Sequence, residues 1–565
     1  MKILGIQKDH NSSVALFENG KLLYYNQEER LSKIKRECRF PFSCVKEIKK
    51  IFNEVDKVLI TGYDSDGLNF IGQYLKHELK LIKNIENQTY IFFNSHHLMH
   101  AAKSFFDSPF KNAIIFVIDG RGSSFNLTNG EVGHETTSIY EVDDLNNFNC
   151  IYKKIYTNSE LTKNLSVNFY HSDNFSYKIK SASINNPYVE ISNSNDMGFF
   201  YNLVAQNYGW KNEEGKLMGL SAFGKYDKNI FDAVNSNDFF IVNHGHKTSN
   251  TYLNFKKYPQ IEINNEDSYK NLSFAVQKKF EKDYLKLVEK FIKKSKYKNI
   301  ILTGGTALNV VNNYEIKKNL NKEYNLFIDP LCGDEGLSIG ICKYYINIYY
   351  PEIKLTKLKN LYLGTSHKYN LKLNKNELCF KNVSIKKIVD LLLKGNIVAL
   401  YQGPSEAGPR ALGNRSLLLD PRIHNGKDIM NSVKKRESFR PFACSILKEK
   451  SHQWFDMGGL EESPFMMYAV HALKDIRKKI NSVIHVDNTC RIQTITKDYN
   501  NILYKILKEF DIHTNTPILM HTSFNLAGEP LVDTPKDAIE TLRKSKIEYL
   551  YFPEVKKLIY IKNEI

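Results

Sequence analysis

Short apolar runs separated by small polar residues open the chain, a pattern typical of β-strands. Residues 2–7 are predicted to form a strand and residues 14–25 a hairpin, because the Asn19-Gly20 pair suits a type I′ turn. Residues 112–131 repeat this plan, with an apolar strand, the loop DGRGSS, a further strand, a second Asn-Gly pair and a return strand. The repetition predicts a duplicated fold.

Helical periodicity is clearest over residues 272–296, where apolar residues recur at intervals of three and four between lysines and glutamates. An apolar strand follows and ends in the loop 304–309, a Gly-Gly pattern found in nucleotide-binding loops and in many other turns. Beyond a connector at 350–372, residues 384–403 predict a helix and then a buried strand.

With 565 residues the chain is too long for one hydrophobic core, so two or three domains are expected. We predict one domain over residues 1–355 and another over 365–565. The stretch 133–195 is rich in Asn, Ser and Tyr without helical periodicity, and it predicts a β-rich or irregular insertion in the first domain.

Composition excludes several classes of protein. No apolar run approaches the roughly 18 residues of a membrane span, and the N-terminus carries no signal-peptide pattern. The eight cysteines form no CxxC pair, which argues against a disulfide framework and a zinc ribbon. A reduced, cytoplasmic protein is expected.

The formal charge of +17 is compatible with nucleic acid, a membrane surface or small anionic substrates. The lysines, however, are spread along the whole chain, as on ordinary solvated surfaces. We therefore expect no nucleic-acid partner.

His96 and His100 are spaced so that both imidazoles project from one face of a helix and can share a cation. A metalloprotease motif would need glutamate at position 97, which is histidine. With 16 histidines, about half of one such pair arises by chance, so a solvated helix is the alternative. Asp119 after an apolar strand and Asp334 in a glycine-rich turn add two carboxylates, and such a set suits Fe(II), Mn(II) or Zn(II) better than Ca(II) or Mg(II).

Arginines gather late in the chain, between residues 410 and 491. They alternate with Gly, Pro, Phe and Leu, whereas arginines on a solvated face usually alternate with Glu and Lys. Guanidinium groups bind phosphate oxygens in pairs, so this region is a candidate polyphosphate site. Scattered surface arginines are the alternative.

Several longer motifs run through nearly the whole chain. They are EERLSKIKRECRFP, SHHLMHA, GKLMGLSAFG, GPRALGNRSLLLDPR, KKRESFRPFA, HVDNTCRIQT and TSFNLAGEP. At these motifs the chain resembles the O-carbamoyltransferases of the nodulation-factor, cephamycin and tobramycin type.

The resemblance implies an α/β protein with an N-terminal actin-like, duplicated domain similar to threonylcarbamoyl transferases, and a C-terminal YrdC-like domain with a twisted sheet. It also implies a reaction in two stages. The C-terminal domain makes carbamoyl-adenylate from carbamoyl phosphate and ATP, and the N-terminal domain transfers the carbamoyl group to an acceptor hydroxyl.

The family motifs assign roles to particular residues of this chain. The implied metal ligands are His96, His100, Asp119 and Asp334. The implied adenylate-binding residues are Lys216, Gly219, Gly304, Gly305 and Asn309. The residues implied to hold carbamoyl phosphate and the triphosphate are Arg410, Arg415, Lys434, Arg436, Arg440, Arg491, Ser523 and Asn525. Among these, Lys434 and Arg436 are expected to be catalytic, and His10 is a candidate base for the acceptor, with a structural turn histidine as the alternative.

Fe(II) is the expected metal, with Mn(II) and Zn(II) as alternatives, and ATP and carbamoyl phosphate are the expected substrates, with Mg(II). The expected acceptor is a hydroxyl of a sugar, a nucleotide-sugar or a natural product, and a homodimer is left open. Two other functions also stay open: threonylcarbamoylation of tRNA adenosine and a nucleotide-binding module without catalysis.

Overall fold

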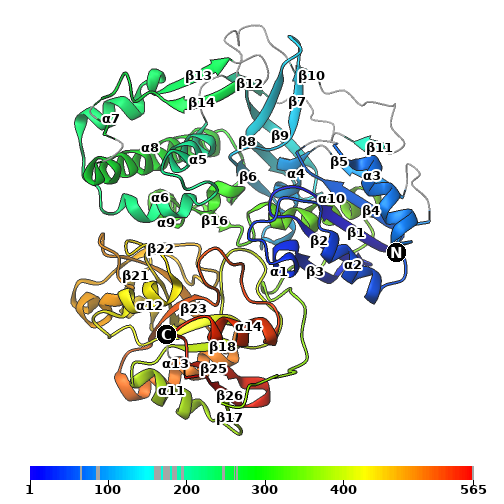
Figure 1. Ribbon diagram of the computed structural model, residues 1–565. Coiled ribbons are helices and arrows are strands. Elements are labelled where there is room, and N and C mark those ends of the chain that lie inside the picture. Colours follow the sequence, from blue (N-terminus) through cyan, green and yellow to red (C-terminus); the bar gives the residue numbers. More distant parts are fainter. Residues whose placement is uncertain are drawn as a thin grey trace. The chain divides into compact units, whose positions relative to one another are not determined.

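The computed structural model describes residues 1–63, 66–83, 89–93, 95–157, 167–168, 178–180, 188–192, 196–244, 249–259, 261–262 and 265–562. The chain divides into two compact units, which are coloured by sequence in Figure 1. Unit 1 comprises Met1–Glu28, Glu37–Asn312 and Asn319–Leu358. Unit 2 comprises Glu29–Arg36, Asn313–Lys318 and Lys359–Ile565.

The first sheet of unit 1 has the strand order β11-β5-β4-β1-β2-β3. Its strands are β1 (Lys2–Gln7), β2 (Ser13–Glu18), β3 (Lys21–Gln27), β4 (Lys57–Thr61), β5 (Tyr90–Phe93) and β11 (Lys178–Lys180). β1, β2 and β3 are antiparallel neighbours, whereas β4 and β5 run parallel to β1. The turn between β2 and β3 has positive φ at Asn19 (48°) and Gly20 (78°), as the predicted type I′ turn requires.

The second sheet repeats this strand plan. Its strands are β6 (Ala113–Ile118), β7 (Ser124–Leu127), β8 (Val132–Val142), β9 (Phe148–Tyr156), β10 (Val167–Asn168), β12 (Tyr188–Ser192), β15 (Asn299–Thr303) and β16 (Asn325–Ile328). β6, β8 and β9 are antiparallel neighbours, and β15 and β16 run parallel to β6. The predicted duplicated α/β fold is confirmed. The return strand β8 pairs with β6, whereas among the described strands β7 pairs with β8 and β10.

The stretch expected to form an insertion begins inside this sheet. Residues 132–156 form β8 and β9, which pair along most of their length. Their side chains are largely buried, so this part of the stretch belongs to the core. Beyond residue 157 the expected insertion lies mostly outside the described residues.

Helices α4 (His96–Asp107) and α10 (Leu337–Tyr349) lie between the two sheets of unit 1. α10 packs on β1, β2 and β4, α4 packs on β6, β8 and β15, and the two helices contact each other. Two glycines allow this closeness. A Cβ at Gly5 of β1 would collide with Ser338 of α10, and a Cβ at Gly340 of α10 would collide with the Met99 carbonyl of α4.

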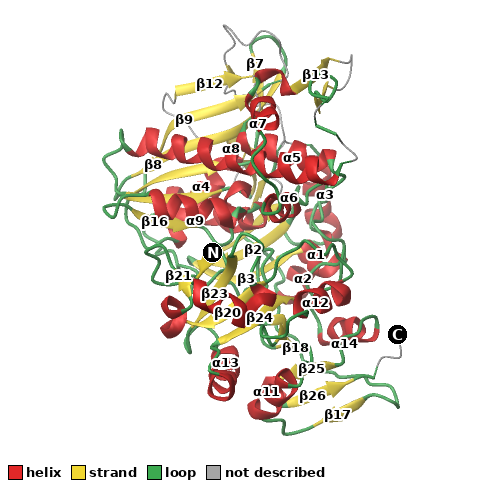
Figure 2. Ribbon diagram, turned by 90° about the vertical axis from the view of Figure 1, so that its left-hand side faces the viewer, coloured by secondary structure: helices red, strands yellow, loops and turns green. Residues whose placement is uncertain are grey.

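The remaining helices of unit 1 surround these layers, and α5, α6 and α7 pack along the long helix α8 (Figure 2). They are α2 (Phe42–Ile51), α3 (Leu68–Gln73), α5 (Met197–Asn207), α6 (Glu214–Ser221), α7 (Lys228–Asn235) and α8 (Glu266–Ile292), with a small hairpin of β13 (Phe240–His244) and β14 (Ser249–Leu253). The helix α9 (Val310–Asn319) begins in unit 1, but its residues Asn313–Lys318 belong to unit 2. α8 begins six residues before the predicted helix because the Asn265 side chain accepts the amides of Asp267 and Ser268.

Unit 2 is built on one mixed sheet of ten strands, in the order β17-β26-β25-β18-β19-β24-β20-β23-β22-β21. The strands are β17 (Leu378–Phe380), β18 (Val398–Tyr401), β19 (Arg415–Leu419), β20 (Ala443–Leu447), β21 (Phe455–Asp456), β22 (Ala469–Ala472), β23 (Thr489–Ile495), β24 (Ile518–Ser523), β25 (Tyr549–Phe552) and β26 (Lys557–Tyr560). The helices are α1 (Glu28–Ser32), α11 (Ile385–Leu393), α12 (Gly426–Lys434), α13 (Asn501–Thr514) and α14 (Pro535–Arg543). The predicted helix and buried strand near residue 390 are confirmed as α11 and β18.

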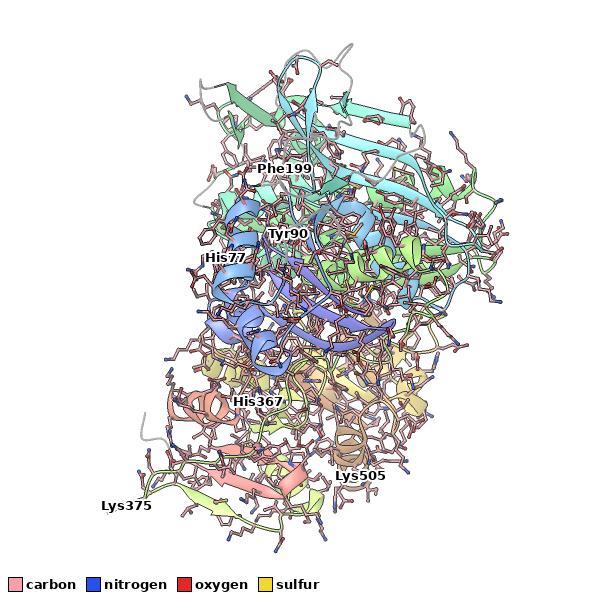
Figure 3. The ribbon with its side chains drawn as sticks, turned by 90° about the vertical axis from the view of Figure 1, so that its right-hand side faces the viewer. His77, Tyr90, Phe199, His367, Lys375 and Lys505 are labelled. Carbon is pink, nitrogen blue, oxygen red and sulfur yellow. The ribbon has the colours of Figure 1, made fainter. Side chains whose placement is uncertain are left out.

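The hydroxyl group of one buried tyrosine finds a main-chain partner. Tyr90 of β5, labelled in Figure 3, is fully buried, and its hydroxyl donates to the Leu68 carbonyl over 2.7 Å. Lys375 and Lys505 of unit 2, also labelled, are exposed at the surface. Across the described residues, no helix combines the length and the apolar character that a membrane span needs.

The close packing of α10 on α4 predicts that Gly340→Ala destabilises the protein. The added methyl group must push the two helices apart, which costs about 1–3 kcal/mol. Gly215→Ala in α6 is the matched control, because its Cβ would meet no atom within 4 Å, and it should leave stability unchanged or slightly raised. Thermal unfolding of both variants checks this, and equal melting temperatures would contradict it.

Candidate metal centre and anion site

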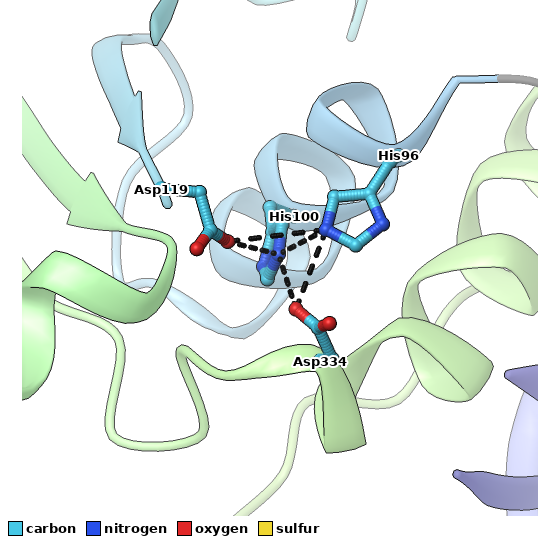
Figure 4. Close-up of side chains that lie close together, drawn as sticks. All are labelled: His96, His100, Asp119 and Asp334. Atoms are coloured by element: carbon cyan, nitrogen blue, oxygen red, sulfur yellow. Dashed lines mark hydrogen bonds and ion pairs between the residues drawn. The ribbon is translucent and has the colours of Figure 1, made fainter. Parts of the chain in front are cut away.

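Four side chains of unit 1 come together at the ends of three elements (Figure 4). His96 and His100 lie on the first two turns of α4, on one face of the helix as their spacing predicts. Asp119 follows the last residue of β6, and Asp334 opens the short 3₁₀ turn Asp334–Gly336 that leads into α10. We call these four residues the histidine-aspartate cluster.

The four ligand atoms of this cluster all lie within 4.8 Å of one another. The Nε2 atoms of His96 and His100 are 3.2 Å apart. His100 Nε2 lies 3.3 Å from Asp119 Oδ2, and His96 Nε2 lies 3.3 Å from Asp334 Oδ1. Among the described residues, the buried Oδ2 of Asp119 accepts no hydrogen bond. Two nitrogen and two oxygen donors that converge in this way fit a divalent transition metal.

Charge interactions inside the cluster are strong because it is buried. Burial lowers the pKa of His96, but the Asp334 and Asp119 carboxylates outweigh burial and raise this pKa to about 10. Burial raises the pKa of the two carboxyl groups, but the imidazoles outweigh it and hold both pKa values well below the usual range. Both aspartates therefore carry negative charge at neutral pH, and imidazolium or a metal cation balances that charge.

Tyr63, which the sequence pattern does not identify, supports this cluster. Its hydroxyl donates to Asp334 Oδ2 over 2.7 Å, and its ring centroid lies 5.2 Å from that of His96. Its amide donates to Asp9 Oδ2, also over 2.7 Å. Burial and the nearby Asp334 carboxylate raise the pKa of Tyr63, so the phenol stays protonated and can donate this hydrogen bond. Its position just beyond a parallel strand, where sites of α/β sheets gather, is the signal that could have identified it.

The predicted adenylate loop lies beside Asp119. Gly304 has φ of 87°, and a Cβ there would collide with the Ile118 carbonyl. A Cβ at Gly305 would lie 2.9 Å from Asp119 Oδ1. Only glycine therefore allows this loop to approach the end of β6 so closely.

Asn309 organises the end of the same loop. Its amide group exchanges hydrogen bonds with the Gln277 side chain of α8, over 3.0 and 3.2 Å. Its Oδ1 also accepts the Asn312 amide over 3.1 Å at the start of α9. These contacts occupy the polar atoms of Asn309 and fix the loop, whereas a direct contact with adenylate stays a prediction.

The contacts of the other predicted residues of unit 1 do not distinguish a functional role from a structural one. Lys216 and Gly219 lie on α6, where the Lys216 ammonium pairs with Glu213 and lies 5.7 Å from the Trp210 ring centroid. His10 lies in the loop between β1 and β2, half-buried, and its carbonyl accepts a hydrogen bond from Gln7. Roles for these residues in catalysis or adenylate binding stay predictions.

Unit 2 gathers six basic side chains, which we call the cationic cluster. They are Lys35, Arg410, Lys434, Arg436, Arg440 and Arg491. Burial lowers the pKa of Lys434, and the charges of Arg436, Lys35 and Arg440 lower it further. Burial also lowers the pKa of Arg491, and the charges of Arg410 and Arg436 lower it further. Mutual repulsion of this kind is relieved when an anion binds.

Lys434 is the most enclosed lysine of this cluster. Its ammonium donates to the carbonyl (2.5 Å) and hydroxyl (3.2 Å) of Ser523, and to the carbonyl (3.1 Å) and side-chain oxygen (2.9 Å) of Asn525. All four acceptors are neutral oxygens. The structure thus places the predicted residues Ser523 and Asn525 as supports that orient Lys434.

Arg415 does not fit its predicted phosphate contact. Its side chain is fully buried, and its terminal nitrogens donate to the carbonyls of Gln402, Gly403, Asn414 and Asp533. Its guanidinium carbon lies 3.6 Å from the Tyr401 ring centroid. These contacts use the guanidinium to hold main chain together, so Arg415 is a structural residue of unit 2.

Lys35 is a member of the cationic cluster that sequence reasoning missed. It belongs to the short segment Glu29–Arg36, which forms part of unit 2 although most of its sequence neighbours belong to unit 1. The signal was present, since this lysine lies inside the EERLSKIKRECRFP motif. Its role was hidden because the partner residues are about four hundred positions away in sequence.

Two family models and several relatives match this chain over most of its length. A family model described as "Carbamoyltransferase N-terminus" matches residues 67–342, and one described as "Carbamoyltransferase C-terminus" matches residues 389–557. An uncharacterised protein of Methanocaldococcus jannaschii is 29% identical over 97% of this chain and 98% of its own length. An uncharacterised protein of Synechocystis sp. is 28% identical over 97% of this chain and 95% of its own length. Nodulation protein NolNO of Sinorhizobium fredii is 25% identical over 96% of this chain and 78% of its own length.

The converging donors of the histidine-aspartate cluster predict that Asp334→Asn weakens metal binding. Loss of one charged ligand should lower the affinity for Co(II), used as a spectroscopic probe, by at least about 100-fold. His77→Ala is the matched control, because His77 is exposed elsewhere on unit 1 (Figure 3). Titration followed by Co(II) absorption measures both, and equal affinities would rule out the cluster as the binding site.

The depressed pKa of Lys434 predicts a pH dependence of anion binding. A bound anion favours the charged ammonium, so binding takes up a proton once the pH exceeds the lowered pKa of the free protein, and affinity falls as the pH rises. Sulfate is a suitable probe because its own charge stays constant over this range. Calorimetry in buffers of different ionisation enthalpy measures the proton uptake. Lys434→Arg should abolish the uptake, and unchanged uptake in that variant would contradict the assignment.

Proposed function

Because this chain belongs to the carbamoyltransferase family, we propose that it transfers a carbamoyl group, activated with ATP, to a hydroxyl group of a small-molecule acceptor. The observation that carries the proposal is the presence in one chain of two distinct clusters. Unit 1 holds the histidine-aspartate cluster, and unit 2 holds a set of buried and half-buried cations that repel one another.

Activation is needed because the nitrogen of a carbamoyl group donates electrons into the carbonyl and makes it a poor electrophile. Attachment to AMP supplies a good leaving group. We assign formation of carbamoyl-adenylate to unit 2. Water cleaves carbamoyl phosphate to carbamate and phosphate, and the carbamate oxygen then attacks the α-phosphorus of ATP and releases pyrophosphate. Lys434, Arg436 and Arg491 would bind the phosphate oxygens there and balance the charge that develops during transfer.

Transfer of the carbamoyl group to the acceptor is assigned to unit 1. His96, His100, Asp119 and Asp334 would hold the metal, with Fe(II) as first choice and Mn(II) or Zn(II) as alternatives, because mixed imidazole and carboxylate donors suit these ions. Such an ion, when bound, supplies Lewis acidity toward carbamoyl or phosphate oxygens. Tyr63, by donating to Asp334, orients that carboxylate.

The loop of Gly304 and Gly305 would receive the adenylate. Its main chain lies against Asp119, so a phosphate bound there would be close to the histidine-aspartate cluster. Lys216 and Gly219 would complete the adenylate contacts from α6. His10 would accept the proton of the acceptor hydroxyl, since it follows β1 at the end of a strand, as Asp119 follows β6.

The acceptor would be a sugar, a nucleotide-sugar or a natural product. Mg(II) would accompany ATP, and the reaction would take place in the cytoplasm. All eight cysteines are free thiols.

The assignment of one stage to each unit predicts that two variants fail differently. His100→Ala should still release pyrophosphate from ATP in the presence of carbamoyl phosphate, but should accumulate carbamoyl-adenylate and form little AMP. Arg436→Ala should lose both activities, by about 10²-fold or more in pyrophosphate release, because charge stabilisation is removed. Pyrophosphate assays and mass spectrometry of the adenylate measure the two stages.

His513→Ala serves as the control, since this histidine is partly exposed on α13 and pairs only with its helix neighbour Glu509 in the described contacts. It should behave like the unaltered protein. Equal loss of pyrophosphate release in His100→Ala and Arg436→Ala would refute the division of labour between the units.

A further inference from the structure

A second polar cluster lies in unit 1 beside the histidine-aspartate cluster. It consists of His97 of α4, Glu135 and Ser138 of β8, and Lys153 of β9. All four side chains are almost completely buried, at 2% exposure or less. Polar groups are costly to bury unless they bond to one another, so a buried cluster of this kind needs a reason.

Glu135 bonds to the main chain at two places that flank the candidate metal ligands. One of its carboxylate oxygens accepts the amide of His97 and the amide of Ser123, each over 3.1 Å. The hydroxyl of Ser123 in turn accepts the amide of His96 over 2.9 Å. The first amides of α4 are therefore satisfied by the Glu135 carboxylate of β8 and by the Ser123 hydroxyl of the loop that begins at Asp119.

The loop from Asp119 to Ser123 packs directly on this cluster. A Cβ at Gly122 would lie 2.7 Å from the Glu135 side chain and 2.9 Å from His97 Nε2. The Gly122 amide donates to the Glu135 carbonyl over 2.8 Å, and the Glu135 amide donates to the Ser123 carbonyl over 3.1 Å. The position of this loop relative to α4 thus depends on Glu135.

Lys153 makes it possible to bury the Glu135 carboxylate. Its ammonium forms an ion pair with Glu135 and donates to Ser138 Oγ over 2.9 Å. Ser138 Oγ also lies 2.8 Å from His97 Nδ1. Lys153 is therefore the group that balances the charge of the Glu135 carboxylate.

We propose that Glu135, neutralised by Lys153, is a positioning residue that sets the distance from the imidazoles of His96 and His100 to the carboxylate of Asp119. Glu135 is not one of the four candidate metal ligands, and it acts through the main chain on both sides of the site. The proposal rests on the metal-binding part of the proposed function. The main alternative to this positioning role is that Glu135 and Lys153 form an ion pair that is important only for folding.

Paired substitutions separate these two roles because they keep the charge balanced. Glu135→Gln combined with Lys153→Met removes both charges but keeps a side-chain oxygen that can accept the two amides. Glu135→Ala combined with Lys153→Met also removes both charges and lacks that oxygen. We expect the first pair to bind Co(II) with near-normal affinity and absorption spectrum, and the second pair to bind about 10- to 100-fold more weakly with shifted absorption bands.

The measurement uses the full-length protein, with thermal unfolding recorded for every variant. Asp107→Asn combined with Lys343→Met is the matched control, since this buried ion pair involves the other end of α4 and should leave Co(II) affinity unchanged. Ser123→Ala is a smaller probe of the same path. It should weaken Co(II) binding several-fold even if the Glu135→Ala pair does not fold. Pyrophosphate release assigned to unit 2 should be unaffected in all variants.

Normal Co(II) affinity and spectrum in a folded Glu135→Ala/Lys153→Met protein, or normal binding in Ser123→Ala, would overturn the positioning role while leaving the proposed metal centre intact. Absence of Co(II) and Fe(II) binding by the unaltered protein would instead overturn the metal centre, and this inference with it.

Discussion

Two carboxylates and two imidazoles, buried with their ligand atoms within 4.8 Å, form the interaction around which unit 1 is organised. Negative charge at such density in a low-dielectric interior has to be balanced by protons or by a cation. The duplicated sheets bring the four groups together. One comes from the end of β6, two from a helix held between the sheets, and one from the turn that leads into the second helix of that layer.

The same helix is fixed by further buried charges at successive turns. Its first amides bond to Glu135 and Ser123. One turn beyond the histidines, Lys103 pairs with Asp329, which lies in the loop between β16 and Asp334. Between these points, α4 packs directly against Gly340 of α10. Each ligand-bearing segment is thereby tied to α4 by main-chain or ionic contacts, which is how a fold made of separate elements can hold donors at coordinating distances.

In unit 2 the same residue type serves opposite purposes. Arg415 lies fully buried against the Tyr401 ring and binds main-chain carbonyls, whereas Arg436 and Arg491 face other cations. Lys434 shows a third case, since its charge meets neutral oxygens of Ser523 and Asn525. A guanidinium in the motif GPRALGNRS therefore says nothing by itself about whether it meets a ligand or the protein. The residues that surround the guanidinium in the fold determine which of the two it contacts.

Patterns local to the chain were sufficient to predict the strand, the type I′ hairpin, the duplicated α/β plan and the spacing of His96 and His100, because periodicity and turn chemistry act over a few residues. The same local patterns singled out Asp119 after a strand and Asp334 in a glycine-rich turn, and the family motifs implied that both are metal ligands. Only the tertiary structure could show the pairing of β8 with β6, the support from Tyr63 and Glu135, and the enclosure of Arg415 by carbonyls. Those features depend on which distant segments pack together and on which polar groups are left to be satisfied once water is excluded, and neither is encoded in the spacing of residues along the chain.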